Sequence, residues 1–370
     1  MRKFLAAWVF AVGLIMAAPT AVQAHGDPAG DSTAALQAKF DELQPGDTLT
    51  LDPGIYRHAG ILHVRVPGVH IDGNGATLEA TNDATSAFWI AADNVTVSNL
   101  NFSAPASGAR YYGTDQHKVV VGANGVTVRD ITIDGSAGVG IFVGGSKSFR
   151  LERVTVRNTR ADGIQITAGA TDGEISNPTI ERTGDDGLAI LSYTDELAGY
   201  GSNASRNIVV QSPVINGTNW ARGIVVAGGE NIHIYNISVS HTSLAGVFVA
   251  SVGAPFFTRS STGVEVSGGT ITDANVTPGF PMGAVAVSSD HRGYSVAQTL
   301  ISGLTITNTA PQAQRNITVE AANGGTLANV ELRDIHIQQQ SDLPAVYSNA
   351  PADGYILSGF TLNGAPIDVP

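Results

Sequence analysis

The sequence of 370 residues contains no cysteine, so disulfides cannot stabilise the chain and its stability must come from packing and backbone pairing. Lysine is also rare, with four in the chain. Acidic residues outnumber basic ones by 32 to 20, which gives a formal net charge of −12. This negative charge argues against nucleic acid or an anionic membrane surface as a partner. It also argues against a polyanionic substrate, unless the binding cleft is locally basic.

The N-terminus has the composition of a secretory signal. It has basic residues at positions 2 and 3, an apolar run over 4–18 and a small-residue cleavage site that ends at Ala24. The apolar run is too short for a membrane anchor, and nothing later in the chain would span a bilayer. We therefore predict a signal peptide over residues 1–24, a mature protein that is secreted or periplasmic, and no membrane attachment after the signal is removed.

Most of the remaining chain alternates polar and apolar residues between Gly, Pro and Asn turns, which predicts β-strands. The exception is a short segment that ends at Phe40, where apolar residues have helical spacing and Asp31 or Ser32 can cap the N-terminus. We expect a helix over residues 31–40 that covers the open end of a sheet.

Between copies of the alternating pattern, a shorter apolar motif recurs. Its copies are GVGIFVGG, ADGIQITAG, DDGLAILSY, RGIVVAGG, AGVFVAS and GAVAVSS, with a period of 23–24 residues where no loop intervenes. Such a period indicates a solenoid; the leucine-rich register is absent and helix formers are scarce. The pattern predicts an all-β fold, a right-handed parallel β-helix of about ten coils, over an antiparallel sandwich or propeller. No linker interrupts residues 25–370, so we expect a single domain.

Aligning the shorter motifs on their glycines places the residues before them in one column along an edge of the solenoid. In chain order, the column contains His117, Val139, Asp162, Asp186, Arg222, Ala245 and Met282. Asp162 and Asp186 should lie one coil apart. Asp185 should lie beside them and point in a different direction from Asp186.

Four segments break the period and are predicted to be loops beside this column: 107–116, 193–207, 254–261 and 290–294. Loops on a rigid scaffold collect binding residues, and aromatic rings commonly stack on sugars, although some of these rings would simply cover exposed core. The aromatic candidates in the first and third loops are Tyr111, Tyr112, Phe256 and Phe257. The candidate substrate-binding residues are His117, Arg222, Tyr193, Tyr200, His291 and Arg292.

Three carboxylates in one patch raise the pKa of at least one of them, which can supply an acid and a base together for glycoside hydrolysis. One acid would face the leaving oxygen while the Asp162/Asp186 pair holds a water. Two other interpretations are a Ca²⁺ site, since carboxylates and loop carbonyls suit that ion, and structural turns, since Asp-Gly is a common turn dipeptide.

The segment Ala161-Asp162-Gly163-Ile164, followed by Gly184-Asp185-Asp186-Gly187-Leu188-Ala189, resembles the three-aspartate core of pectin-lyase-like glycoside hydrolases. The polygalacturonase series is incomplete, because Arg222-Gly223 stands where Gly-His-Gly is expected and no Arg-x-Lys follows. The α-1,3-glucanase (mycodextranase) family is more similar. This resemblance implies an inverting hydrolase with Asp162, Asp185 and Asp186 as catalytic residues. Asp185 would be the general acid, and Asp162 with Asp186 would position and deprotonate water.

We therefore expect a monomeric glycoside hydrolase that acts on a neutral or weakly charged polysaccharide and needs no cofactor, with Ca²⁺ as the possible exception. A polysaccharide lyase or uronan epimerase on the same scaffold is the first alternative. It would need a basic residue for proton abstraction. A non-catalytic carbohydrate-binding solenoid is the second.

Overall fold

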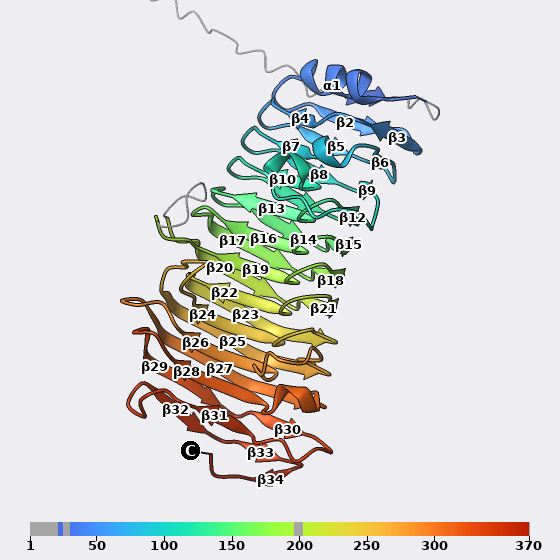
Figure 1. Cartoon of the computed structure of the whole chain (residues 1–370). Helices are drawn as coiled ribbons and strands as arrows, with labels where there is room; N and C mark the ends of the chain where they lie inside the picture. The colour runs from blue at the N-terminus through green and yellow to red at the C-terminus, as the bar shows by residue number, and fades with distance from the viewer. Residues whose placement is uncertain (1–20, 25–29, 196–202, 370) are drawn as a thin grey trace, which may run out of the picture.

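The computed structural model, in which residues 21–24, 30–195 and 203–369 are described, is a stack of β-coils with one α-helix at its N-terminal end (Figure 1). Each regular coil contributes one strand to an eleven-stranded sheet, which follows the turns that contain Asp162 and Asp186, and further strands to a second, larger sheet. The predicted fold class is confirmed.

The first sheet, here called the site sheet, has eleven described strands in chain order, every pair parallel. They are β4 (Leu62–Val64), β7 (Phe88–Ile90), β10 (Val119–Val121), β13 (Ile141–Gly144), β16 (Ile164–Thr167), β19 (Leu188–Leu191), β22 (Ile224–Ala227), β24 (Val247–Ser251), β26 (Val285–Ser289), β28 (Ile317–Ala321) and β31 (Val346–Ser348).

The second sheet wraps the rest of each coil, and its described pairs are parallel except the last, β33 with β34. Its strands in the first half of the chain are β1 (Ala21–Ala24), β2 (Thr48–Leu51), β3 (Ile55–His58), β5 (His70–Asp72), β6 (Thr77–Ala80), β8 (Thr96–Ser98), β9 (Asn101–Ser103), β11 (Thr127–Arg129), β12 (Thr132–Ser136), β14 (Arg150–Glu152), β15 (Thr155–Thr159), β17 (Thr171–Ser176) and β18 (Thr179–Thr183). The remainder are β20 (Arg206–Gln211), β21 (Val214–Thr218), β23 (Glu230–Ser240), β25 (Ser261–Thr272), β27 (Ser295–Thr307), β29 (Thr326–Arg333), β30 (His336–Gln338), β32 (Tyr355–Ser358), β33 (Thr361–Leu362) and β34 (Ala365–Pro366).

Inward side chains of successive coils stack on one another and form the core. Val128, Leu151 and Ile175 are consecutive members of one such ladder, and all three are buried. The second sheet bends sharply once per coil at a residue with positive φ, for example Asn177 at 51° between β17 and β18. Asparagine tolerates this left-handed conformation, which is one reason that Asn recurs in the sequence pattern.

The predicted N-terminal helix is confirmed as α1 (Thr33–Asp41). Its buried face presents Leu36 and Phe40 to the first coils, and the Phe40 ring packs edge-on against Phe88 at 5.9 Å between centroids. The helix lies across the N-terminal end of the stack (Figure 1). It thereby covers a sheet end that would otherwise expose apolar surface and unpaired backbone.

The predicted signal peptide falls largely on residues 1–20, which lie outside the described part of the chain. Its last four residues form β1, which pairs in parallel with β2. Among the described residues, no helix is long and apolar enough to cross a membrane. Secretion stays a prediction.

The predicted loops 107–116 and 290–294 lie between strands, as expected, and so does 254–261 except for Ser261, the first residue of β25. Of the predicted loop 193–207, residues 196–202 lie outside the described part of the chain, and Arg206 already begins β20. Three short 3₁₀ helices occur among the described connections: η1 (Asp83–Thr85), η2 (Thr114–Gln116) and η3 (Pro311–Ala313). One alignment was wrong by a residue. Val247 pairs with Val285, so Gly283 rather than Met282 shares the position of Ala245. The lengthened connection before β26 hides this shift in the sequence.

Candidate active site

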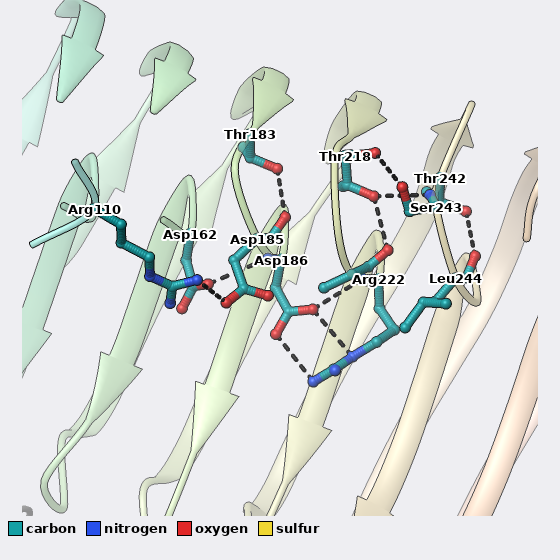
Figure 2. Close-up of polar contacts among 11 residues, drawn as sticks. Arg110, Asp162, Thr183, Asp185, Asp186, Thr218, Arg222, Thr242, Ser243 and Leu244 are labelled. Atoms are coloured by element: carbon teal, nitrogen blue, oxygen red, sulfur yellow. Dashed lines mark hydrogen bonds and ion pairs between the residues drawn. The ribbon is translucent and has the colours of Figure 1, made fainter. Parts of the chain in front are cut away.

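The acidic column lies in the turns that lead from the second sheet into the site sheet. Ile164 pairs with Leu188, so Asp162 and Asp186 occupy the same position on neighbouring coils, as the spacing predicts. Each turn is held by a buried hydroxyl: Thr159 donates to the carbonyl of Ala161 at 2.7 Å, and Thr183 donates to the carbonyl of Asp185 at 2.7 Å. Figure 2 shows the same device at Thr218 and Thr242 on the following coils.

The glycine that follows each acid is required by the close approach of successive coils. A Cβ at Gly163 would lie 2.7 Å from the carbonyl oxygen of Gly187, and a Cβ at Gly187 would lie 2.6 Å from that of Gly223. Neither Gly163 nor Gly187 has a positive φ. These two Asp-Gly pairs therefore owe their glycines to coil packing, and the turn-dipeptide interpretation does not account for them.

The three carboxylates meet in one cluster. Asp162, Asp185 and Asp186 each place an oxygen within 4.8 Å of the others, even though Asp185 and Asp186 are adjacent in the chain. The backbone N–H of Asp186 donates to Asp162 Oδ1 at 3.2 Å, which ties the two coils together at the acids. Asp185 and Asp186 differ in burial and in partner: Asp186 is buried and bonds Arg222, whereas the Asp185 side chain is a quarter exposed and bonds Arg110.

Two arginines neutralise two of these acids (Figure 2). Arg222 donates two hydrogen bonds to Asp186: its backbone N–H lies 2.9 Å from Oδ1 and its side-chain Nη2 lies 3.1 Å from Oδ2. Arg110 reaches from the loop between β9 and β10 and donates from Nη1 to Asp185 Oδ2. Asp162 is buried like Asp186 and has no ion pair among the described residues; its Oδ1 accepts the N–H of Asp186.

Burial sets the protonation of the inner pair. It raises the pKa of Asp162 well above the ordinary value, and the charges of Asp186 and Asp185 raise it further. Burial also raises the pKa of Asp186 to about 6, a rise that Arg222 opposes. Of the two, Asp162 is therefore the more readily protonated, and Arg222 favours the carboxylate form of Asp186.

A cleft of about 610 Å³ opens over the acids. Its floor is the outward face of the site sheet, where Phe142, Gln165, Ala189, Val225 and Phe248 occupy one register position on five consecutive coils. Of these five, Phe142, Gln165 and Phe248 line the cleft directly. Small side chains in the middle and rings at both ends make a trough with the acids along one side.

The structure brings only some of the predicted binding residues to this cleft. His117, Arg222 and Tyr193 line it, as do Tyr111, Tyr112 and Phe256 from the predicted loops. His117 is buried, its Nδ1 accepts the N–H of Val139 at 3.1 Å, and burial lowers its pKa to about 4. It therefore presents a neutral Nε2–H donor.

The remaining candidates do not reach it. His291 is buried against Tyr294, 4.2 Å between ring centroids, with its Nδ1 2.7 Å from the carbonyl of Thr258. Arg292 is exposed and does not line the cleft. Phe257 packs edge-on against His291, on the core side of its loop. Tyr200 lies outside the described residues.

Sequence reasoning missed Arg110, Phe142, Gln165 and Phe248. A signal for the last three existed, because each stands two residues after the aligned glycine of its motif. Nothing in the sequence pointed to Arg110, which belongs to a loop without repeat and contacts Asp185 across 75 residues of chain.

A divalent cation would find three carboxylates here, and this is the group of described acidic side chains that could hold one. However, both oxygens of Asp186 already accept from Arg222, and Arg110 holds Asp185. The arginines supply the positive charge that a hard cation would supply. The donor set therefore fits acid/base chemistry better than it fits Ca²⁺.

Comparison with known proteins places the fold. A family profile described as "Right handed beta helix region" matches residues 59–204, and no curated protein matches the sequence. The protein is thus a right-handed parallel β-helix, the predicted fold.

Among solved structures, the chain is similar to the catalytic unit of a GH87 α-1,3-glucanase from Streptomyces thermodiastaticus (TM-score 0.68, 18% identity, 94% of this chain and 70% of that one). It is also similar to an endo-xylogalacturonan hydrolase from Aspergillus tubingensis (0.62, 15%, 93% and 100%). The A-module of a mannuronan C-5 epimerase from Azotobacter vinelandii has the same fold (0.58, 17%, 90% and 97%).

Proposed function

We propose that the protein is a glycoside hydrolase that cleaves a neutral polysaccharide with Asp162, Asp185 and Asp186. The observation that carries this proposal is the cluster of three carboxylates on the wall of a cleft, two of them buried with raised pKa values. Hydrolysis of a glycosidic bond needs a protonated acid and an ionised base on either side of the anomeric carbon. Its structural neighbours include glycoside hydrolases, which is consistent with that chemistry.

In this mechanism, Asp185 is the general acid because it is the most exposed of the three and can reach the leaving oxygen. Asp186 is the base and, with the protonated Asp162, holds the attacking water. Arg222 keeps Asp186 ionised and orients it through both oxygens. Asp185 first takes a proton from solvent on Oδ1, the oxygen that Arg110 does not bond. As water attacks, one proton of the water passes to Asp186 while the proton of Asp185 passes to the departing sugar oxygen, and Asp186 then returns its proton to solvent.

Attack by a held water inverts the anomeric configuration. Each oxygen of Asp186 accepts one hydrogen bond from Arg222 and keeps a lone pair that can accept the proton of water. The separation of at most 4.8 Å is shorter than the ~6.5–9.5 Å usual between acid and base in inverting enzymes. Proton NMR of the first product anomer therefore tests this step directly. Release of the retained anomer would contradict direct attack by water and would indicate a covalent glycosyl-enzyme intermediate.

The charge of the cleft supports a neutral glycan. The described basic residues that line it are Arg110, Arg222 and His117. The two arginines are each paired with an acid, and the low pKa of His117 keeps it neutral. A uronan substrate for a lyase or epimerase would bring its own carboxylates beside three aspartates, with none of these cations to receive them.

The test is a reducing-sugar assay with the purified protein on α-1,3-glucan, other α-glucans, pectin and alginate. Asp185→Asn and Asp186→Asn are the diagnostic variants. Asp353→Asn, an exposed aspartate that also precedes a glycine, is the matched control. We expect the wild type and the control to release reducing ends from a neutral glucan and both diagnostic variants to lose about 10²–10⁴-fold in rate. Release from no glycan, products that absorb in the ultraviolet, or activity that survives both substitutions would refute the proposal.

A further inference from the structure

A loop far from the acids in sequence is fixed directly over them. The connection between β9 and β10 carries Arg110 to Asp185, and its backbone is bound on both sides of that residue. Arg160 donates from Nη2 to the carbonyl of Pro105 at 2.8 Å and from Nη1 to the carbonyl of Ala109 at 2.9 Å. Beyond Arg110, the N–H of Tyr111 donates to the carbonyl of Ala137 at 2.9 Å.

Arg160 is itself anchored in two directions. Its side chain is 5% exposed and forms a two-point ion pair with Asp83, 2.6 Å from Nη1 to Oδ2 and 3.2 Å from Nη2 to Oδ1. A Cβ on Gly108 would lie 2.7 Å from Nη1, so the loop wraps closely around the guanidinium. A charged group this buried is costly unless fully bonded, and here carboxylate and carbonyl oxygens satisfy most of its donors.

The same arginine also belongs to the acid turns. Arg160 stands two residues before Asp162, and a Cβ on Gly184 would lie 2.5 Å from its backbone carbonyl. The N–H of Asp185 donates to the neighbouring carbonyl of Ala161 at 3.2 Å. The backbone that presents the acids and the loop that presents Arg110 are therefore held by one residue.

We propose that Arg110 is a positioning residue for Asp185, and that the Arg160–Asp83 pair acts through it by fixing the loop. Arg110 holds the Asp185 side chain on the cleft side of the cluster, away from the buried pair. When the glycan enters, the guanidinium stays on Asp185 Oδ2 and the glycosidic oxygen meets the proton on Oδ1. This proposal rests on the role of Asp185 as general acid.

Of the two arginines near Asp185, Arg110 bonds its side chain. The titratable and charged groups around it are Asp162, Asp186, Arg110, Arg222 and the neutral His117. Arg222 is committed to Asp186, so Arg110 is the described cation that bonds Asp185. Without it, repulsion from the two other acids would turn the Asp185 side chain outward.

The experiment compares Arg110→Gln and Arg110→Lys on a glycan that the wild type cleaves, with Arg150→Gln as control, because Arg150 forms an exposed ion pair with Glu174. We expect Arg110→Gln to lower kcat about tenfold to a hundredfold with KM nearly unchanged, and Arg110→Lys to recover part of the loss. Asp83→Asn should show the same changes at smaller size.

A readout without substrate separates this inference from the function beneath it. A crystal structure of Arg110→Gln without substrate should show the Asp185 side chain turned out of the cluster, whereas Arg150→Gln should keep it in place. If it does and no glycan is cleaved by the wild type, the hydrolase proposal fails while the contact stands. If Arg110→Gln matches the control in kcat and in the position of Asp185, or loses kcat with no displacement of Asp185 and no rescue by lysine, the positioning role is refuted.

Discussion

The two coils that carry the acids and the coils that follow them have the same backbone but different chemistry. Asp162 and Asp186 share their register position with Ala245 and Gly283 further along the site sheet. The turn before Ala245 has the same hydroxyl device, with Thr242 donating to the carbonyl of Leu244 at 2.7 Å. Successive coils thus have equivalent positions in this column, and two of these positions hold a buried carboxyl group, Asp162 and Asp186. Breaking the symmetry between these coils should reveal what each contributes.

The largest effect is expected at Asp162. Asp162→Asn should reduce glycan cleavage about 10²–10⁴-fold, because the water loses one of its two holders. The same change should raise the free energy of unfolding at pH 8 by about 1–2 kcal/mol, since the folded protein no longer has to keep a buried carboxyl from ionising. Asn can still accept the N–H of Asp186 through Oδ1. Parallel activity and thermal-denaturation measurements check this, and a variant less stable than wild type at pH 8 would contradict it.

The pH dependence of stability should carry the same signature with a defined sign. The raised pKa values mean that the folded state binds more protons than the unfolded chain between about pH 4 and the folded pKa of each acid, about 6 for Asp186. The contribution of these acids to stability is therefore complete at low pH and is lost as pH rises through about 6. The difference in unfolding free energy between Asp162→Asn and wild type should accordingly grow from pH 5 to pH 8. A difference that is constant with pH would show that Asp162 is ionised when folded.

The second-largest effect is expected at the glycine beside the acids. Gly187→Ala places a Cβ 2.6 Å from the Gly223 carbonyl oxygen and 2.7 Å from Ile215 Cγ2, so the coils must separate. We expect a loss of about 3 kcal/mol in stability, together with most of the activity. The same substitution at Gly279 should cost much less: its new Cβ meets nothing within 4 Å, although its φ of 88° adds strain. Chemical denaturation of both variants measures the contrast.

A smaller effect is expected at Arg222. With Arg222→Gln, Asp186 keeps its burial and loses the cation that opposes the rise of its pKa, so the acidic limb of the activity profile should move up from about pH 6. Activity falls below this limb because a protonated Asp186 cannot accept the proton of water. An unchanged limb would mean that another group is the base.

The smallest effect is expected on the floor of the cleft. Phe248 and Tyr347 share one outward column of the site sheet, three coils apart. Phe248 lines the cleft and supports the Arg222 guanidinium at 5.3 Å, whereas Tyr347 does not line it. Phe248→Ala should raise KM roughly threefold to tenfold, the scale of one lost ring contact, and Tyr347→Ala should leave it unchanged. Equal effects of the two would place the glycan along the whole sheet.

One structural neighbour is an epimerase and another is a glycoside hydrolase, although both are similar to this chain in fold. The fold alone therefore does not determine the reaction. The same coils support both kinds of protein, so activity depends on which side chains occupy the column and on the loops above it. In this chain, three acids and two committed arginines occupy that place.

The sequence by itself determined the solenoid, the pairing of Asp162 with Asp186 and the position of most loops. These features depend on a repeat of fixed length, because parallel coils of equal size put residues one period apart in contact. The alignment erred where a longer connection preceded the glycine, since Gly283 and not Met282 occupies the column. Local pattern carries no information on how many residues a loop adds before the strand resumes.

Only the tertiary structure decided the environment of the acids. Arg110 contacts Asp185 from 75 residues away through a loop that has no period, and Arg160 holds that loop with Asp83, 77 residues before it. The tertiary structure also shows that His291 and Arg292 do not line the cleft. The ring of His291 instead packs against Tyr294 and bonds the carbonyl of Thr258. Such contacts follow from where non-repeating loops fold over the sheet. Burial and charge at the acids, and so their protonation, exist only once those loops are in place.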